Sequence, residues 1–243
     1  MKKRALLEIS VETLAAAIAA VRGGADRVEL CEDLSVGGVT PSADLMREAR
    51  QQVQIPIFVM IRPRGGGFNY SAAEFAEMKA HIELAKSARM DGVVFGILTA
   101  DRRVDVPRNK ELVKSAKPLP ATFHRAFDEL EDLQTGLEDV IATGVTRVLT
   151  SGGGATAEEG VSSIARLLRQ AGDRITILPG GGIRPGNLRR IARDARASEF
   201  HSGLSNLLPA PGGTLGLFEE GIRTLASVLE EETRILEPTT KTR

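Results

Sequence analysis

The chain has 243 residues, enough for one large α/β barrel or two small domains and ample for a buried core. Its 32 Lys and Arg residues balance 32 Asp and Glu residues, so it lacks the basic excess that binds nucleic acid or anionic membranes. With no Trp, one Tyr and 4% aromatic residues, it also offers few rings for stacking on single-stranded nucleic acid.

Cysteine content and hydropathy bear on the cellular compartment. Cys31 is the only cysteine, which excludes an intrachain disulfide and a Cys-rich zinc site of the finger or ribbon type. The apolar stretch near the start is interrupted by Glu8 and Glu12, unlike the core of a signal peptide, and no run of 18 apolar residues occurs. We therefore expect a cytoplasmic protein without a transmembrane helix.

Short apolar runs with β-strand character recur along the chain. Each is followed by a segment with apolar residues at the spacing of an amphipathic helix, as in Leu14, Ile18 and Val21. The runs predict eight strands, at 5–10, 27–31, 57–62, 92–98, 121–125, 147–151, 175–179 and 198–202.

Helix start signals agree with this alternation. Ser71 with Glu74, and Thr156 with Glu159, have the capping-box spacing that satisfies free N–H groups at the start of a helix. Pro185 stands where a proline in the first turn costs no hydrogen bond.

Strict alternation of strand and helix predicts a parallel sheet. Eight such units in about 200 residues fit a (β/α)₈ TIM barrel better than an open doubly wound sheet. The open, Rossmann-like alternative normally has a Gly-rich phosphate turn after its first strand, whereas Ser10 leads directly into a helix. We expect a single TIM-barrel domain over 1–243, with a mobile loop at 209–213 and a frayed end at 237–243.

Polar and sulfur-bearing residues break the apolar runs near the strand ends, where barrels carry their function. Because side chains alternate along a strand, these residues fall on common faces. Burying charges without partners costs several kcal/mol, so their repeated placement predicts a ligand site at the barrel mouth. This set comprises Glu8, Ser10, Glu29, Cys31, Met60, Arg62, Thr122, His124, Glu199 and His201.

Three Gly-rich segments indicate anion binding. TSGGG (150–154) follows the sixth predicted strand, and PGGGIRPGN (179–187) follows the seventh, where barrels often bind phosphate through backbone N–H groups. RPRGGGFNYS (62–71) adds two arginines that can clamp a carboxylate or phosphate. The alternatives are tight βα turns and a solvated surface loop. The predicted anion-binding residues are Arg62, Arg64, Ser151, Gly152, Gly180, Gly181 and Gly182.

Characteristic motifs stand at the ends of the predicted strands. They include GGADRVELC (23–31), IRPRGGGFNYS (61–71), TFHRAFD (122–128), LPGGGIRPGN (178–187) and EFHSG (199–203). Together these motifs resemble those of the CutC family. The resemblance covers nearly the whole chain. It implies a TIM-barrel fold, a cytoplasmic homo-oligomer and a role in copper homeostasis with binding of Cu(I).

A Cu(I) site in this chain would contain at most one thiolate per subunit, because Cys31 is the only cysteine. Cu(I) favours thiolate and thioether ligands and accepts imidazole. The candidate ligands are therefore Cys31, Met60, His124 and His201, which come from four different strands and share one ion only if the mouth is narrow. The alternative for Cys31 and Met60 is ordinary filling of the barrel.

The second hypothesis is an enzyme that acts on a small anionic or phosphorylated metabolite by acid–base chemistry. Carboxylates and imidazoles in a partly dry cavity can acquire pKa values suited to proton transfer near neutrality. A variant places a divalent ion among oxygen and imidazole ligands at Glu8, Glu29 and His201. The expected partner is a metal ion or a small anion, not nucleic acid or a membrane. The catalytic candidates are Glu8, Glu29, Arg62, His124, Asp128 and His201.

Overall fold

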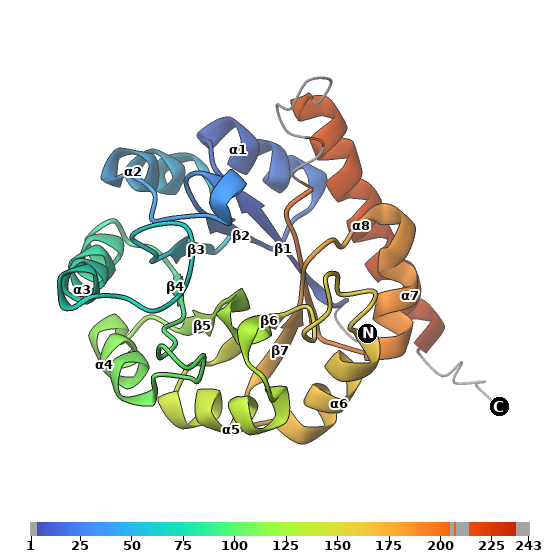
Figure 1. Cartoon of the computed structure of the whole chain (residues 1–243). Coiled ribbons are helices and arrows are strands. Elements are labelled where there is room, and N and C mark those ends of the chain that lie inside the picture. The colour runs from blue at the N-terminus through green and yellow to red at the C-terminus, as the bar shows by residue number, and fades with distance from the viewer. Residues whose placement is uncertain (1–3, 205–206, 208–213, 237–243) are drawn as a thin grey trace.

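The computed structural model describes residues 4–204, 207 and 214–236. Within these residues the helices form a ring around a central set of strands (Figure 1). The segments 209–213 and 237–243, which we expected to be loose, lie outside the described residues.

The strands form a parallel sheet in the order β7-β6-β5-β4-β3-β2-β1-β8. Parallel ladders join each neighbouring pair in that order, and β7 lies beside β8, so the sheet curves into a nearly closed barrel. This confirms the predicted (β/α)₈ architecture. The strands are β1 (Leu6–Val11), β2 (Arg27–Leu30), β3 (Ile57–Met60), β4 (Gly92–Phe95), β5 (Ala121–Phe123), β6 (Arg147–Thr150), β7 (Thr176–Pro179) and β8 (Glu199–Ser202).

Each strand is followed along the chain by an α-helix, and short 3₁₀ helices are inserted after β2 and β5. In the part of the chain that the structure describes, no helix combines the length and apolar character needed to cross a membrane. The helices are α1 (Leu14–Gly23), η1 (Leu34–Val36), α2 (Ala43–Gln52), α3 (Ala72–Ser87), α4 (Val106–Ala116), η2 (Arg125–Glu129), α5 (Leu133–Thr143), α6 (Val161–Ala171), α7 (Pro185–Ala195) and α8 (Leu215–Leu236).

The helix starts agree with the sequence signals in two of three places. Ser71 and Glu74 form the predicted capping box before α3, and Pro185 is the first residue of α7. The prediction that Thr156 starts a helix was wrong. Thr156 accepts the N–H of Glu159 within a turn, and α6 begins only at Val161. The intervening Gly160 packs so tightly on Ser151 that no side chain fits there.

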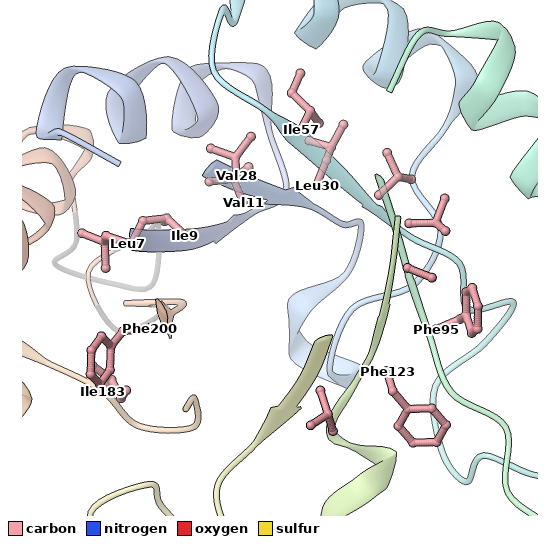
Figure 2. Close-up of a cluster of buried hydrophobic side chains, with 14 of the residues drawn as sticks. Leu7, Ile9, Val11, Val28, Leu30, Ile57, Phe95, Phe123, Ile183 and Phe200 are labelled. Carbon is pink, nitrogen blue, oxygen red and sulfur yellow. The ribbon is translucent and has the colours of Figure 1, made fainter. Parts of the chain in front are cut away.

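Alternation along the strands separates the apolar core from the polar interior. Leu7 and Ile9 of β1 project with Val28 and Leu30 of β2 into the apolar core between strands and helices (Figure 2). The residues between them in sequence, such as Glu8, therefore face the barrel axis. The apolar side chains stabilise the barrel from outside, and the polar ones are left to build a site within it.

Candidate functional site

A buried charge network forms the base of the site. Arg27, at the start of β2, donates from Nε to Glu8 of β1 and from Nη2 to Glu199 of β8, the latter at 2.5 Å. The guanidinium also stacks over the ring of Phe58, 4.7 Å from its centroid. Burial would raise the pKa of Glu8, but attraction to Arg27 and His201 lowers it to about 2. Glu8 is therefore ionised near neutral pH, and its fixed charge anchors Arg27 and His201.

His201 of β8 is fixed by this anchor. Its Nδ1 lies 2.7 Å from Glu8 Oε1, and because Glu8 is ionised, Nδ1 is the donor. Its Nε2 faces Glu29, 3.9 Å from Oε2. Burial lowers the pKa of His201, but the two carboxylates outweigh burial and the net shift is upward.

Glu29 of β2 is the second acid–base group. Its Oε2 lies 3.5 Å from the Cys31 thiol, which donates to it, whereas its buried Oε1 has no hydrogen-bond partner in the described chain. Burial raises the pKa of Glu29, and attraction to His201 offsets this only in part. Glu29 and His201 thus face each other across 3.9 Å as an acid–base pair, and the pKa of each is raised.

Glu29 and His201 border a cavity of about 890 Å³ at the C-terminal ends of the strands. Glu29, Met60, Arg62, His124 and His201 contribute to its wall, whereas Glu8 and Cys31 do not. Another hollow, of about 610 Å³, lies at the opposite end of the barrel beside Glu199 and α8. The acid–base pair therefore faces the larger cavity, on the side where barrel enzymes carry their sites.

His124 enters the wall as a neutral donor. Its Nδ1 accepts the N–H of Ala126 at 3.2 Å, so the ring proton is on Nε2, which is buried and has no partner among the described residues. Burial and the neighbouring Arg62 guanidinium lower the pKa of His124 to about 3. The ring stays uncharged near neutrality.

Arg62 is largely committed to the loops around the cavity. Its Nη1 donates to Val36 O at 2.8 Å and to Gly38 O at 2.9 Å, and its Nη2 donates to Gly66 O at 2.7 Å. These bonds use three of its five N–H groups, and Nε, buried and without a partner in the described chain, is among those left for a ligand. The guanidinium therefore joins two loops and keeps part of its donor capacity.

Arg64 and Arg125 both lie where the sequence did not lead us to expect them. Arg64 points away from the cavity and binds Glu74 and the carbonyls of its own loop. Arg125, which is not among the predicted site residues, lines the cavity. A Cβ placed on Gly181 would lie 3.2 Å from its Cζ, so the guanidinium rests against that glycine. The position of Arg125 directly after His124, at the end of a predicted strand, was the sequence signal that could have identified it as a site residue.

The predicted glycine sites fall into two groups. Gly181 and Gly182 line the cavity with φ of +99° and +71°, and their N–H groups donate to no acceptor in the described chain. The N–H groups of Ser151, Gly152 and Gly180 are already bound within the protein, to Asp128, to the Thr150 hydroxyl and to the Thr150 carbonyl. Free N–H groups for an anion are thus found after β7.

Asp128 holds the loop after β6. Its carboxylate accepts the N–H groups of Ser151 and Gly153 and the Thr150 hydroxyl, and it pairs with Arg125 Nε at 2.8 Å. Through these contacts Asp128 orients Arg125 and the loop. Asp128 positions neighbouring groups at the cavity rim.

Metal binding can be judged from the donors that come together. Among the described His, Cys, Asp and Glu side chains, the group that could share an ion is Glu8, Glu29 and His201, with ligand atoms within 4.8 Å of one another. Cys31 is fully buried in an apolar cluster with Met60, and burial and the charge of Glu29 raise the pKa of its thiol well above the usual value. Among these residue types, Cys31, His124 and His201 do not form such a group in the described chain, and the donors that come together are mainly oxygen.

Comparison with known proteins gives a consistent family. The model of the CutC family matches residues 5–206. A human copper homeostasis protein cutC homolog is 50% identical over 196 residues, covering 81% of this chain and 72% of the relative. A CutC family protein of Chromobacterium violaceum is 49% identical over 197 residues, covering 81% and 80%.

Solved structures agree in fold. The putative copper homeostasis protein CutC from Streptococcus agalactiae matches with a TM-score of 0.77 and 34% identity, over 82% of this chain and 98% of that one. Phosphoribosyl anthranilate isomerase from Thermotoga maritima matches with a TM-score of 0.61 over 93% and 99%. At 14% identity the second likeness concerns the barrel alone.

Proposed function

This chain belongs to the CutC family, whose relatives carry names from copper homeostasis, and we propose that it is an enzyme that acts on a small anionic metabolite by acid–base chemistry. The observation that carries the proposal is the facing pair Glu29 and His201 at the wall of an 890 Å³ cavity. Such a pair of shifted groups in a cleft is typical of a catalytic site.

The roles follow from the contacts. Glu29 takes a proton from the substrate through Oε1, the oxygen that has no hydrogen-bond partner among the described residues. His201 exchanges a proton with Glu29 or the substrate through Nε2, while Glu8 keeps its Nδ1 protonated and its ring fixed. Arg27 balances the charge of Glu8, so proton transfer at Glu29 does not require a change at Glu8.

The anion is bound on the other side of the cavity. The free N–H groups of Gly181 and Gly182 lie just before α7, and the partly exposed Arg125 guanidinium lies against Gly181. Unpaired N–H groups near a helix start, together with an arginine, suit a phosphate or carboxylate. The positive φ angles explain why glycine stands at both positions.

Thermal shift measurements test this function. Inorganic phosphate and a panel of phosphorylated and carboxylated metabolites are added to the protein, and ligands that raise the melting temperature are then incubated with it and followed by NMR. At about 100 times its Kd, a ligand specific to the folded state stabilises it by ~2.7 kcal/mol. Turnover should fall by roughly 10²–10⁴-fold in Glu29→Gln.

Two controls make that experiment decisive. Gly182→Ala, which forces a side chain onto a left-handed backbone, should weaken anion binding, whereas Gly186→Ala in open space on α7 should not. The proposal fails if no anion of the panel, phosphate included, shifts the melting temperature of the wild-type protein.

Binding of Cu(I) is the second candidate function. It is supported by the names of the relatives and by the packing of Cys31 against Met60 in one cluster. The test is anaerobic competition with a Cu(I) chelator, in which Cys31→Ser should sharply weaken binding and Met60→Leu should weaken it less. Equal affinity in Cys31→Ser would remove Cys31 from any copper site.

The divalent-ion variant is tested separately. Elemental analysis of the purified protein and titration with Mn²⁺ and Zn²⁺ should show binding that Glu29→Gln abolishes. We also propose, from the family resemblance, a cytoplasmic homo-oligomer. Light scattering after size exclusion tests the oligomer, and cell fractionation tests the location.

A further inference from the structure

Three buried polar atoms without a partner in the described chain belong to residues of the cavity wall. They are Glu29 Oε1, His124 Nε2 and Arg62 Nε. Buried polar groups in folded proteins are nearly always paired, so a ligand is the natural partner for these atoms. One of the three accepts a proton and two donate, which defines the chemistry of what they bind.

The two donors suit an oxygen atom. His124 presents an N–H from a ring that is held without charge, because Nδ1 is occupied by the Ala126 N–H. Arg62 presents its Nε–H while loop carbonyls fix the orientation of its guanidinium by accepting from both Nη atoms. A carbonyl oxygen of the substrate accepts from such donors, and the bonds strengthen as the oxygen gains negative charge.

The His124 ring is held firmly in this orientation. A Cβ at Gly96 would come within 2.7 Å of its Nδ1, so the chain packs directly against the ring on that side. The Phe68 ring covers it with centroids 4.8 Å apart. A neutral imidazole donor that does not reorganise during the reaction is well suited to stabilise an oxyanion.

Building on the proposed function, we propose that the reaction begins with removal of a proton from a carbon next to a carbonyl group, with Glu29 as the base and His124 as the donor to the carbonyl oxygen. The C–H bond pair becomes the C=C bond, and the C=O π pair moves to oxygen. On an α-hydroxy carbonyl compound, the proton goes to the Glu29 carboxylate and returns to the former carbonyl carbon. His124 Nε2 gives its proton to the former carbonyl oxygen and takes the proton of the hydroxyl group, whose oxygen becomes the new carbonyl oxygen. An isomerisation of an anionic hydroxycarbonyl compound results, without oxidant or reductant.

The cavity wall also argues against a covalent route to the same chemistry. A Schiff base needs a positioned amine, and no lysine belongs to the cavity wall in the described chain. Free enolate formation instead needs a base and an oxyanion donor, and the described part of the cavity wall holds an unpaired group of each kind.

The first test concerns the ring itself. The chain has three histidines, so ¹⁵N-edited NMR can follow each, with His124→Gln and His81→Gln providing assignments. His124 should show the neutral tautomer with hydrogen on Nε2 throughout pH 5 to 8. A ring protonated in that range, or carrying its proton on Nδ1, would overturn the proposal while leaving anion binding and the Glu29–His201 pair unaffected.

The second test compares two small ligands. Glycolohydroxamate imitates a planar enediolate, and glycolate has a similar size but is an ordinary carboxylate. The wild-type protein should bind the hydroxamate about 100-fold more tightly, at the low end for transition-state mimics. That preference should be lost in His124→Gln and retained in His81→Gln, whose side chain lies on α3 outside the cavity wall.

The outcomes separate the two proposals. Equal binding of both ligands, weakened by Gly182→Ala, would overturn enolate chemistry and leave an anion-binding enzyme. Failure of both ligands and of inorganic phosphate to bind would overturn the proposed function as well. Melting curves of each variant show whether a loss of binding reflects a loss of folding.

Discussion

His201 Nδ1 lies 2.7 Å from Glu8 Oε1, and the two residues are register partners on the paired strands β8 and β1. The other oxygen of Glu8 binds Arg27, its register partner on β2. A single carboxylate thus ties three neighbouring strands together. Because Glu8 is held in the ionised state, changes of protonation in the site fall on Glu29 and His201.

Replacing Glu8 with glutamine should lower the pKa of His201. The carboxylate stabilises the protonated ring by attraction and by accepting from Nδ1, and an amide supplies no charge. Titration of the His201 ring by NMR measures the effect. Glu199→Gln is the control, because it removes one of the two carboxylates paired with Arg27 and leaves the partners of His201 in place. An unchanged His201 pKa in Glu8→Gln would contradict the assigned role of the pair.

Replacing Arg27 with methionine should destabilise the protein strongly. Removing one partner of a buried ion pair leaves the Glu8 charge uncompensated, at a cost of roughly 3–5 kcal/mol. Urea unfolding at neutral pH measures this change. Arg223→Met, which breaks exposed pairs on α8, should have little effect by comparison.

The same ion pair predicts how stability depends on pH. The pKa of Glu8 is about 2 in the folded protein, below its ordinary value of 4.5. Its contribution to the free energy of unfolding is therefore complete above about pH 4.5 and is lost as the pH falls towards 2. Urea unfolding at a series of pH values checks this. Glu8→Gln should lose less stability between these limits than the wild-type protein.

The barrel architecture could be predicted from the sequence because the architecture depends on local patterns. Period-two runs, helical spacing and turn residues recur eight times, and each is readable without knowledge of distant contacts. The alternation also placed Glu8, Glu29 and His201 on inward faces, where the structure brings them together. What could be predicted was the set of residues that face the interior.

Which of these inward-facing residues contact one another could not be predicted from local patterns. That Arg27 meets Glu8 depends on the stagger between β1 and β2, which is a property of the closed barrel. The hydrogen bonds of Arg62 depend on the path of two loops, whose carbonyl groups accept from its guanidinium. Cys31 lies on a strand face that the sequence assigns to the mouth, but it is fully buried beside Met60 and does not line the cavity. Depth and loop path are tertiary properties.

Cys31 should react slowly with thiol reagents although it is a free cysteine. It is fully buried, and burial together with the charge of Glu29 raises the pKa of its thiol well above the usual value. Since the thiolate is the reactive form, modification near neutral pH requires opening of the barrel. A colorimetric thiol assay should show little reaction in buffer and one thiol per chain in denaturant. Rapid reaction of the native protein would contradict this environment.

Gly96→Ala should disturb His124 without altering any polar residue of the site. The new methyl group would lie 2.7 Å from Nδ1 of the ring, so the ring must move away from the Ala126 N–H that fixes its tautomer. We expect a loss of about 1–3 kcal/mol from overpacking. We also expect the His124 NMR signals to shift towards a mixture of tautomers. Gly186→Ala, with open space around it in the first turn of α7, should instead stabilise the protein by about 0.5–1 kcal/mol and leave those signals unchanged. If Gly96→Ala matched the wild-type protein in both urea unfolding and the His124 spectrum, the ring would not be held by the packing described here.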